Sequence, residues 1–291
     1  PITVTFSENV TVTGTPQLTL ETGSTDVVVD YTSGSGTSTL TFNYTVAAGH
    51  NSNDLDFVGT GSLGLSDFSM GTTSYFEGSS FNEDARITLA GNYAYVSNAG
   101  SNLFIIDISD LNSPGNPSSI NIPARSLAIA GNYAYVASAS SGLAIIDISN
   151  PTSPGTPVYE NTNGYAFDVT ISDSYAYLAD GDAGLAIIDI SDPTNPGSPI
   201  YKITNGNAQG VAVRGNYAYV ADDSGLAIID ISDPTNPGTP VYKGTNGQAR
   251  SVNIRNNYAY VAEMSSGLAI IDISVPTNPG NPIYVNDSGS G

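Results

Sequence analysis

The sequence contains no cysteine and only one histidine, His50. Without cysteine, disulfides, thiolate metal sites and a cysteine nucleophile are excluded. His50 lies in a turn-rich stretch without a nucleophile motif, so the common catalytic triads and zinc sites are excluded as well. Hydrolysis by a pair of carboxylates is the enzymatic option that remains. Nothing in the sequence selects such a pair, and we expect a protein that is not an enzyme.

Positive charge is also scarce, with 7 Lys and Arg against 27 Asp and Glu and a net charge of −20. This excess of negative charge opposes binding to nucleic acid and to anionic membranes, and we expect neither as a partner. The sequence has no run of about eighteen apolar residues, so we expect no membrane insertion. Acidity keeps a β-rich protein soluble and supplies the oxygen ligands that calcium prefers.

The sequence does contain a repeat. Residues 184–197, Gly-Leu-Ala-Ile-Ile-Asp-Ile-Ser-Asp-Pro-Thr-Asn-Pro-Gly, recur with few changes towards the C-terminus, and each copy follows a Tyr-Ala-Tyr motif. The counterparts of Asp189 in these copies are Asp107, Asp147, Asp230 and Asp272. A period of about forty residues with several short β-segments is typical of propeller blades. Thr, Val, Ile and Tyr are abundant, and the sequence predicts an all-β fold.

Each repeat divides into four predicted strands, in the third repeat residues 168–172, 175–178, 185–190 and 199–203. The first strand should line the axis. It is joined to the second by a two-residue turn, such as Gly131-Asn132, whose residue types tolerate positive φ. The third strand is apolar on both faces, as expected between stacked sheets. Prolines end this strand because proline cannot donate a hydrogen bond to a ladder.

The Leu-Ala-Ile-Ile-Asp sequence, in its Tyr-Ala-Tyr-Val context, resembles the LVIVD family of β-propeller repeats, found mostly in bacterial and archaeal exported or surface proteins. The resemblance spans residues 85–287 and implies a fold and a location but no reaction. Five repeats predict a five-bladed propeller of four-stranded blades over residues 74–287, closed by the chain itself. Residues 74–77 supply a spare outer strand. Either it completes the last blade and displaces residues 283–285, or something outside the chain closes the ring.

Residues 1–65 alternate with period two and form a separate predicted domain. Val4-Thr-Phe-Ser-Glu-Asn-Val10, Val12-Thr-Gly-Thr-Pro-Gln-Leu-Thr-Leu20 and Tyr44-Thr-Val-Ala-Ala-Gly-His50 resemble the bacterial Ig-like repeats of large surface adhesins. The resemblance implies a small Ig-like β-sandwich that is incomplete, because the strands expected before and after it are not visible. Residues 66–73 are a predicted linker, and residues 288–291 a predicted flexible tail.

One candidate site is a ring of side chains just ahead of the first strand of each repeat, where loops converge on the axis. Aligning the repeats places these residues at one position: Arg86, Arg125, Phe167, Gln209 and Arg250. Three arginines at one mouth would bind a carboxylate or a sulfate. The alternative, that each arginine pairs with a carboxylate of the protein itself, stays open.

Acidic residues give a second candidate site, for calcium, the only cofactor that we consider. The residues concerned are Asp180, Asp182, Asp222, Asp223, Glu8, Asp54 and Asp56. Their oxygens suit that ion, although a single loop rarely supplies six ligands and solvated surface carboxylates are the alternative. The Asp that recurs in every repeat is interpreted as structural, accepting hydrogen bonds from turn amides. The recurring tyrosines are interpreted as packing between blades.

The sequence therefore predicts a non-enzymatic structural or adhesive protein of a bacterial or archaeal cell surface or extracellular fibre. The alternative is a module of a secreted protein that binds a glycan or a peptide. Partners would be further copies of the chain, or other surface proteins and glycans. A sandwich that lacks a strand exposes unpaired backbone groups, so residues 74–77 or 285–291 of a neighbouring copy could fill the vacancy and form a head-to-tail filament. Alternatively, flanking residues of a longer adhesin complete the domain.

Overall fold

The structure is a computed structural model that contains strands and turns. It describes residues 1–10, 12, 15–20, 27–46, 85–98, 102–110 and 114–285, without the side chains of residues 7–9. No helix occurs in these ranges, and hence none that is long and apolar enough to cross a membrane. The described residues belong to two compact units, one before residue 47 and one after residue 84.

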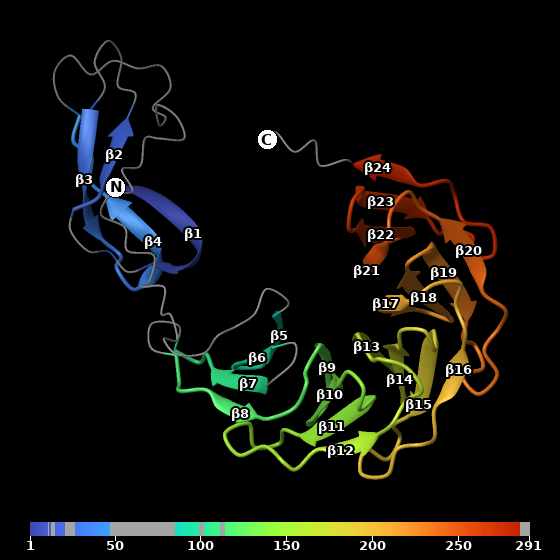
Figure 1. Cartoon of the computed structure of the whole chain (residues 1–291). Coiled ribbons are helices and arrows are strands. Elements are labelled where there is room, and N and C mark those ends of the chain that lie inside the picture. The colour runs from blue at the N-terminus through green and yellow to red at the C-terminus, as the bar shows by residue number, and fades with distance from the viewer. Residues whose placement is uncertain are drawn as a thin grey trace. The chain divides into compact units, whose positions relative to one another are not determined.

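The first unit contains a four-stranded antiparallel sheet (Figure 1). Its strands are β1 (Ile2–Val10), β2 (Gln17–Leu20), β3 (Val27–Ser33) and β4 (Thr37–Phe42), in the order β1-β4-β3-β2. Leu18, Leu20, Val29, Leu40 and Phe42 are buried together on one face, as the period-two pattern predicts. β1 and β2 are the edge strands. The Ig-like sandwich stays a prediction, because residues 47–65 lie outside the described ranges.

The second unit contains five four-stranded antiparallel sheets, one for each repeat, that follow one another in chain order (Figure 1). The first sheet has β5 (Arg86–Ala90), β6 (Tyr93–Asn98), β7 (Asn102–Asp107) and β8 (Ser118–Ile120). The second has β9 (Ser126–Ala130), β10 (Tyr133–Ala137), β11 (Leu143–Asp147) and β12 (Val158–Glu160). The third has β13 (Asp168–Ser172), β14 (Tyr175–Ala179), β15 (Leu185–Asp189) and β16 (Ile200–Lys202). The fourth has β17 (Ala208–Arg214), β18 (Tyr217–Asp222), β19 (Gly225–Asp230) and β20 (Val241–Gly244). The fifth has β21 (Ala249–Arg255), β22 (Tyr258–Glu263), β23 (Gly267–Asp272) and β24 (Ile283–Val285).

Two-residue turns join the first two strands of every sheet, as predicted. In the second sheet Ala130 pairs with Tyr133, which leaves Gly131 and Asn132 as the turn. The first turn residue has a positive φ of 52° to 56° in all five sheets: Gly91, Gly131, Asp173, Gly215 and Asn256. Asp and Asn are the non-glycine residues that tolerate this conformation best, so the residue types that predicted the turn also explain it.

The recurring aspartate holds the turn after the third strand. Asp189 Oδ1 accepts a hydrogen bond from the Ser191 amide at 2.8 Å, and the Asp189 carbonyl accepts one from the Gly197 amide at 2.8 Å. A Cβ on Gly197 would lie 3.1 Å from the Asp189 Cβ, so the glycine of the Pro-Gly pair packs directly on the aspartate. The same bonds recur at Asp107, Asp147, Asp230 and Asp272. The structural interpretation of this aspartate is confirmed.

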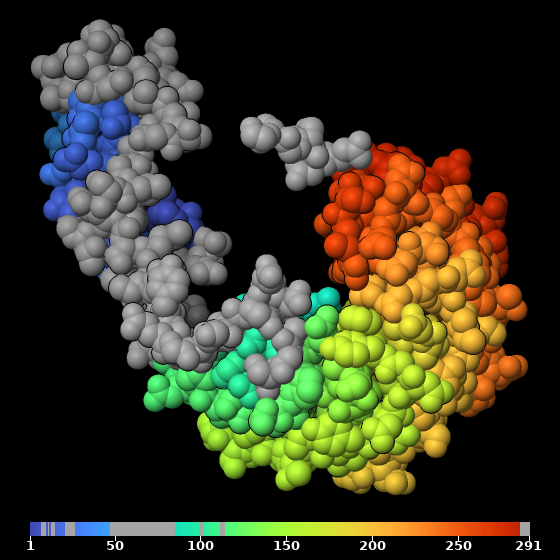
Figure 2. Space-filling model, viewed as in Figure 1, coloured from blue at the N-terminus to red at the C-terminus, as the bar shows by residue number. Residues whose placement is uncertain are grey.

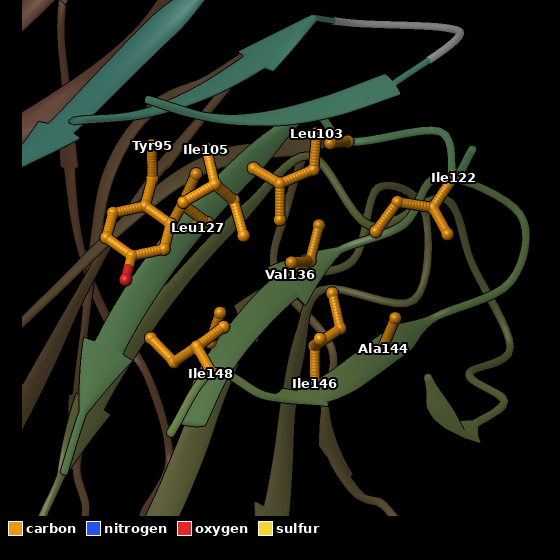
Figure 3. Close-up of a cluster of buried hydrophobic side chains, with 11 residues drawn as sticks. Tyr95, Leu103, Ile105, Ile122, Leu127, Val136, Ala144, Ile146 and Ile148 are labelled. Atoms are coloured by element: carbon orange, nitrogen blue, oxygen red, sulfur yellow. The ribbon is translucent and has the colours of Figure 1, made fainter. Parts of the chain in front are cut away.

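Each sheet packs on the next through two apolar faces. We call the face that a sheet turns to the following sheet its forward face, and the opposite one its back face. At the first junction Tyr95 and Ile105 of the forward face meet Leu127, Val136 and Ile146 of the next back face (Figure 3). Equivalent residues form the other three junctions, and Figure 2 shows the second to fifth sheets in continuous contact.

The recurring tyrosines of the forward faces lie inside these junctions, as predicted. They are Tyr95, Tyr135, Tyr177 and Tyr219, each at most 3 % exposed. Burial raises the pKa of Tyr177 to about 12, with smaller contributions from Asp173 and Tyr175. The tyrosines are therefore neutral packing residues.

The predicted closure of the ring is not observed among the described residues. The fifth sheet's forward face is partly exposed, and the first and fifth sheets lie at the two ends of the succession in Figure 1. β24 pairs with β23 and holds the outer position of the fifth sheet. Residues 283–285 are therefore not displaced from the last sheet. Residues 74–77, the predicted linker 66–73 and the predicted tail 288–291 lie outside the described ranges.

Candidate ligand-binding surface at the axis

The side chain of Asp168 in β13 connects the first strands of three other sheets. Its Oδ1 accepts hydrogen bonds from Ser126 Oγ at 2.6 Å and from Arg86 Nη1 at 3.2 Å, and its Oδ2 accepts one from the Val211 amide at 3.0 Å. One carboxylate of β13 thus joins β5, β9 and β17. β21 lies beside β17. These contacts agree with the prediction that the first strands line the axis.

Arg86 does not occupy the position that the sequence alignment assigned to it. Arg86 pairs with Ser97, whose equivalent in the third sheet, Ala179, pairs with Asp168. The amide of Phe167, one residue earlier, bonds to the Ala179 carbonyl. Arg86 therefore aligns with Asp168 and not with Phe167. Arg86 precedes its Tyr-Ala-Tyr motif by seven residues, as Asp168 does, whereas Phe167 precedes its motif by eight. Its ion pair with Asp168 at 3.2 Å matches the alternative that was left open.

Arg125 lies over two aromatic rings. Its Cζ is 5.5 Å from the centroid of Tyr165 and 5.2 Å from that of Phe167, and the two ring centroids are 4.7 Å apart. Tyr165 is 40 % exposed, whereas Phe167 and Arg125 are half-buried. A guanidinium over an aromatic face is held by cation–π attraction. We call Arg125, Tyr165 and Phe167 the Arg125 shelf. Tyr165 was missed by sequence reasoning, because this residue does not recur in the other repeats.

Gln209 and Arg250 have polar neighbours of their own. Gln209 donates to Asn207 Oδ1, and Asn207 Nδ2 donates to Asp182 Oδ1 at 2.9 Å. Arg250 Nη2 contacts Gln248 Oε1 at 3.3 Å and Met264 Sδ at 2.7 Å. The three predicted arginines therefore have three different surroundings, a carboxylate, an aromatic pair and a glutamine with a methionine. The predicted common arginine cluster is wrong in this respect.

A buried carboxylate behind this surface anchors the loop that precedes the first strand. Asp180 Oδ1 accepts from Thr162 Oγ1 at 2.6 Å, and Asp180 Oδ2 accepts from the Gly164 amide at 3.0 Å. In the next sheet Asp222 accepts from the amides of Gly206 and Ser224. Burial raises the pKa of Asp180 and of Asp222 above the usual aspartate value. Thr162, Gly164 and Gly206 belong to a recurring Thr-Asn-Gly sequence, a signal that sequence analysis could have used.

In the fifth sheet the same position is Glu263. Its two carboxyl oxygens are buried and have no hydrogen-bond partner among the described residues. Thr245 and Gly247 are the counterparts of Thr162 and Gly164, and a Cβ on Gly247 would lie 3.2 Å from the Glu263 Cβ. The loop is therefore close enough to bond, but the side chain is one methylene longer than aspartate.

Three of the seven predicted calcium ligands accept hydrogen bonds from protein donors. Asp180, Asp182 and Asp222 accept the hydrogen bonds given above, so a cation would have to replace them. Asp223 Oδ1 is buried without a partner in the described part of the chain. Within the described ranges no group of three or more His, Asp or Glu side chains could hold a metal ion. Asp54 and Asp56 lie outside these ranges, and the side chain of Glu8 is not described.

The fold and the repeats together define a β-propeller protein. Five segments match the model of the LVIVD repeat: residues 84–121, 123–157, 163–198, 205–240 and 246–287. These matches cover more than half of the chain, and the chain belongs to the LVIVD repeat family. No curated protein matches the chain as a sequence.

Solved structures resemble the chain in fold. The computationally designed Ika8 protein has a TM-score of 0.52 at 10 % identity, over 92 % of this chain and 76 % of that one. A functionally unknown protein from Desulfotomaculum acetoxidans DSM 771 has a TM-score of 0.51 at 15 % identity, over 70 % and 68 %. The β-propeller domain of Cps50 (Swd1) from Myceliophteria thermophila has a TM-score of 0.52 at 12 % identity, over 69 % and 68 %. At such identities the likeness concerns the fold alone.

Proposed function

We propose that the chain is a non-enzymatic adhesive component of a bacterial or archaeal cell surface or extracellular fibre, and that it binds an acidic glycan on the Arg125 shelf. In this proposal the five sheets are the five blades of the propeller, and residues 1–65 form an Ig-like domain. The location is supported by the resemblance of both parts of the sequence to surface and exported proteins. The observation that carries the binding function is the Arg125 shelf.

The shelf combines the two groups that an acidic sugar needs. The exposed ring of Tyr165 offers an apolar face to the C–H groups of a sugar ring, and the guanidinium beside it offers paired donors to a carboxylate or sulfate. Phe167 packs against the guanidinium of Arg125 and restricts it, so less side-chain entropy is lost on binding than for an unrestrained arginine. The net charge of −20 repels acidic ligands at a distance. Binding should therefore need the short-range contacts of the shelf and tolerate physiological salt.

The test is the binding of the 291-residue chain to a panel of uronic-acid and sulfated oligosaccharides. We expect Arg125→Gln and Tyr165→Ala each to weaken binding about tenfold or more, the loss expected when a hot-spot arginine or tyrosine is removed. Arg255→Gln is the matched control, because Arg255 is exposed and lies at the far end of β21. Equal binding of all variants to every oligosaccharide that the wild type binds would refute the shelf as a site.

Self-association by strand addition is the structural half of the proposal. The edge strands β1 and β2 present backbone groups to which an extended segment of another copy can add. Residues 285–291, which begin with the last residue of β24, are one predicted donor. Negative-stain microscopy should show fibres of the whole chain that are lost when residues 286–291 are removed. Unchanged fibres would exclude this segment as the donor.

A further inference from the structure

One position of the repeat brings two arginines to the same end of the axis. Eight residues before the Tyr-Ala-Tyr motif, the second to fifth repeats have Arg125, Phe167, Gln209 and Arg250. The first strands at whose start these residues lie, β9, β13, β17 and β21, are on the inner side of the succession of sheets in Figure 1. Since the strands of these sheets follow one another in the same order, the four residues lie at the same end of the axis.

A bulge takes Arg250 out of the regular strand ladder. The pairing of β21 with β22 shifts by one residue between Ala249 and Ser251, so Arg250 is the extra residue. Such a bulge re-aims the side chain of the residue that it leaves unpaired. The bulge of β17 leaves out Gln209, but this side chain is 9 % exposed and donates to Asn207. Arg250 is half-buried, so its side chain is the more accessible of the two.

The guanidinium of Arg250 has no carboxylate partner among the described residues, whereas that of Arg86 pairs with Asp168. Arg250 Nη2 contacts the exposed side chains of Gln248 and Met264. Arg250 Nε is buried and has no hydrogen-bond acceptor in the same ranges. A buried donor without an acceptor costs free energy. A carboxylate or sulfate from outside supplies the acceptors that the protein does not.

The residues between the Arg125 shelf and Arg250 form a continuous surface. Gly181 packs on both sides, since a Cβ there would lie 3.3 Å from the Tyr165 amide nitrogen and 3.5 Å from Asn207 Nδ2. Gly210 of β17 packs on β21, because a Cβ on it would lie 2.9 Å from the Arg250 carbonyl oxygen. A ligand that leaves the ring of Tyr165 can therefore pass over the half-buried Asn207 towards Arg250.

We propose that Arg250 is a second subsite for an acidic group, and that the ligand is a linear oligosaccharide with acidic groups on at least two of its sugars. One acidic group lies on the Arg125 shelf and another on Arg250. This inference rests on the proposed function, because the shelf is the first of the two subsites. In a closed ring both subsites lie at the same mouth of the axis. The exposed ring of Tyr165 favours a sugar chain over an acidic peptide, since it offers a face to the C–H groups of a sugar.

Two subsites on one ligand predict that affinity depends on the length of the sugar chain. Once one acidic group is bound, the second binds within the same complex and at a high effective concentration. The affinity of the chain should therefore rise about tenfold or more from a single uronic acid to an oligomer that reaches both arginines.

Titration calorimetry of the 291-residue chain with oligomers of one uronic acid, from the monosaccharide upwards, tests this. Arg250→Gln should remove the rise with length and leave the affinity for the monosaccharide unchanged. Arg125→Gln should weaken the binding of every oligomer. The matched control is Arg255→Gln, because Arg255 is exposed and lies at the other end of β21. All three variants should melt as the wild type does.

The outcomes separate the second subsite from the shelf. An affinity that does not depend on length, or a rise that Arg250→Gln leaves intact, would overturn the second subsite and leave the shelf standing. Equal losses with Arg250→Gln and Arg255→Gln would also overturn it, because they would reflect net charge alone. Binding of oligoglutamate that needs Arg250, without binding of any oligouronate, would assign the surface to a peptide and overturn the inference.

Discussion

Glu263 stands in the fifth repeat where the third and fourth repeats have the aspartates Asp180 and Asp222. Asp180 and Asp222 accept hydrogen bonds from the loop before the first strand of their sheets. The carboxyl oxygens of Glu263 are buried without a partner in the described structure. Replacing a buried, unsatisfied group by one that can bond recovers about 1 kcal/mol or more. We therefore expect Glu263→Asp to raise the free energy of unfolding by about this amount, as measured by urea denaturation.

The converse substitution Asp180→Glu is the control for Glu263→Asp. It should lower the unfolding free energy, because Thr162 and Gly164 lose a well-placed acceptor. A stability that does not respond to either substitution would show that solvent satisfies Glu263 and that the length of the side chain does not matter.

At the scale of residues, sequence reasoning succeeded where a residue recurs and failed where it does not. The role of Asp189 and its counterparts followed from their period and their turn context. Arg86 was misplaced by one position, because it precedes Tyr93 by seven residues whereas Phe167 precedes Tyr175 by eight, and the pairing of β5 with β6 shows the same offset. Tyr165 was missed because a ring that stacks once in five repeats leaves no pattern in the sequence.

At the scale of elements, two glycines with positive φ allow the cost of the backbone conformation to be compared with the cost of a steric clash. Gly215 has a φ of +54° in an open hairpin turn, where a Cβ would meet nothing within 4 Å. Gly184 has a φ of +78°, and a Cβ there would lie 2.7 Å from the Thr204 amide and still closer to the Lys202 carbonyl. We expect Gly215→Ala to cost about 1 kcal/mol, the price of the conformation alone. Gly184→Ala should cost distinctly more, about 3 kcal/mol, because backbone must move.

Thermal unfolding of the two glycine variants and the wild type measures this difference. Equal destabilisation by both substitutions would mean that the loop before β15 yields without loss, and that Gly184 is needed for its φ only.

The strands and hairpins were the most predictable part of the molecule. Apolar runs, turn residues and prolines gave all four strands of a repeat, because each of these signals acts within a few residues. The bulges in β17 and β21, at Gln209 and Arg250, were not predicted. A bulge depends on how the neighbouring strand pairs, which no local pattern contains.

At the scale of the whole molecule, acid should first stabilise the chain and then destabilise it. Burial raises the pKa of Asp180 and Asp222 above 3.8, so the folded state gains stability as the pH falls through these raised values. Turn aspartates such as Asp189 have a pKa lowered by the Ser191 amide and hydroxyl, and their contribution is lost as the pH falls below 3.8. The melting temperature should therefore peak at a mildly acidic pH above 3.8.

Melting curves recorded between neutral pH and pH 3 would check this profile. The double variant Asp180→Asn, Asp222→Asn should show a shallower rise on the acidic side of neutrality. A melting temperature that falls steadily from pH 7 downwards would contradict the assignment.

Chelation is expected to leave the described sheets unchanged. Asp180, Asp182 and Asp222 already accept hydrogen bonds from protein donors, so they do not need a cation. Adding EDTA to the purified chain should leave its melting temperature within the error of the measurement. A fall that calcium reverses and magnesium does not would restore a calcium site, and Asp54→Asn with Asp56→Asn would then test the candidates outside the described ranges.

The whole-molecule architecture was predictable in kind and not in detail. The repeats predict a propeller because each repeat forms a sheet whose two apolar faces must be buried against neighbouring sheets. The number of sheets that a ring needs depends on the small rotation between neighbours, which is set by packing and not written in any single repeat. Whether the chain closes its own ring could therefore not be predicted from the sequence.

Asp168 has a consequence for the way in which the molecule comes apart. In most repeat arrays a unit touches only its neighbours, so the two ends fray independently and with similar ease. Here a carboxylate in the third sheet holds Arg86 of the first, whereas its described partners include no residue of the fifth. Opening should therefore run in one direction, from β24 inwards. Amide hydrogens of β22 and β23 should exchange with deuterium sooner than those of β6 and β7, and Asp168→Asn should make the two ends more alike.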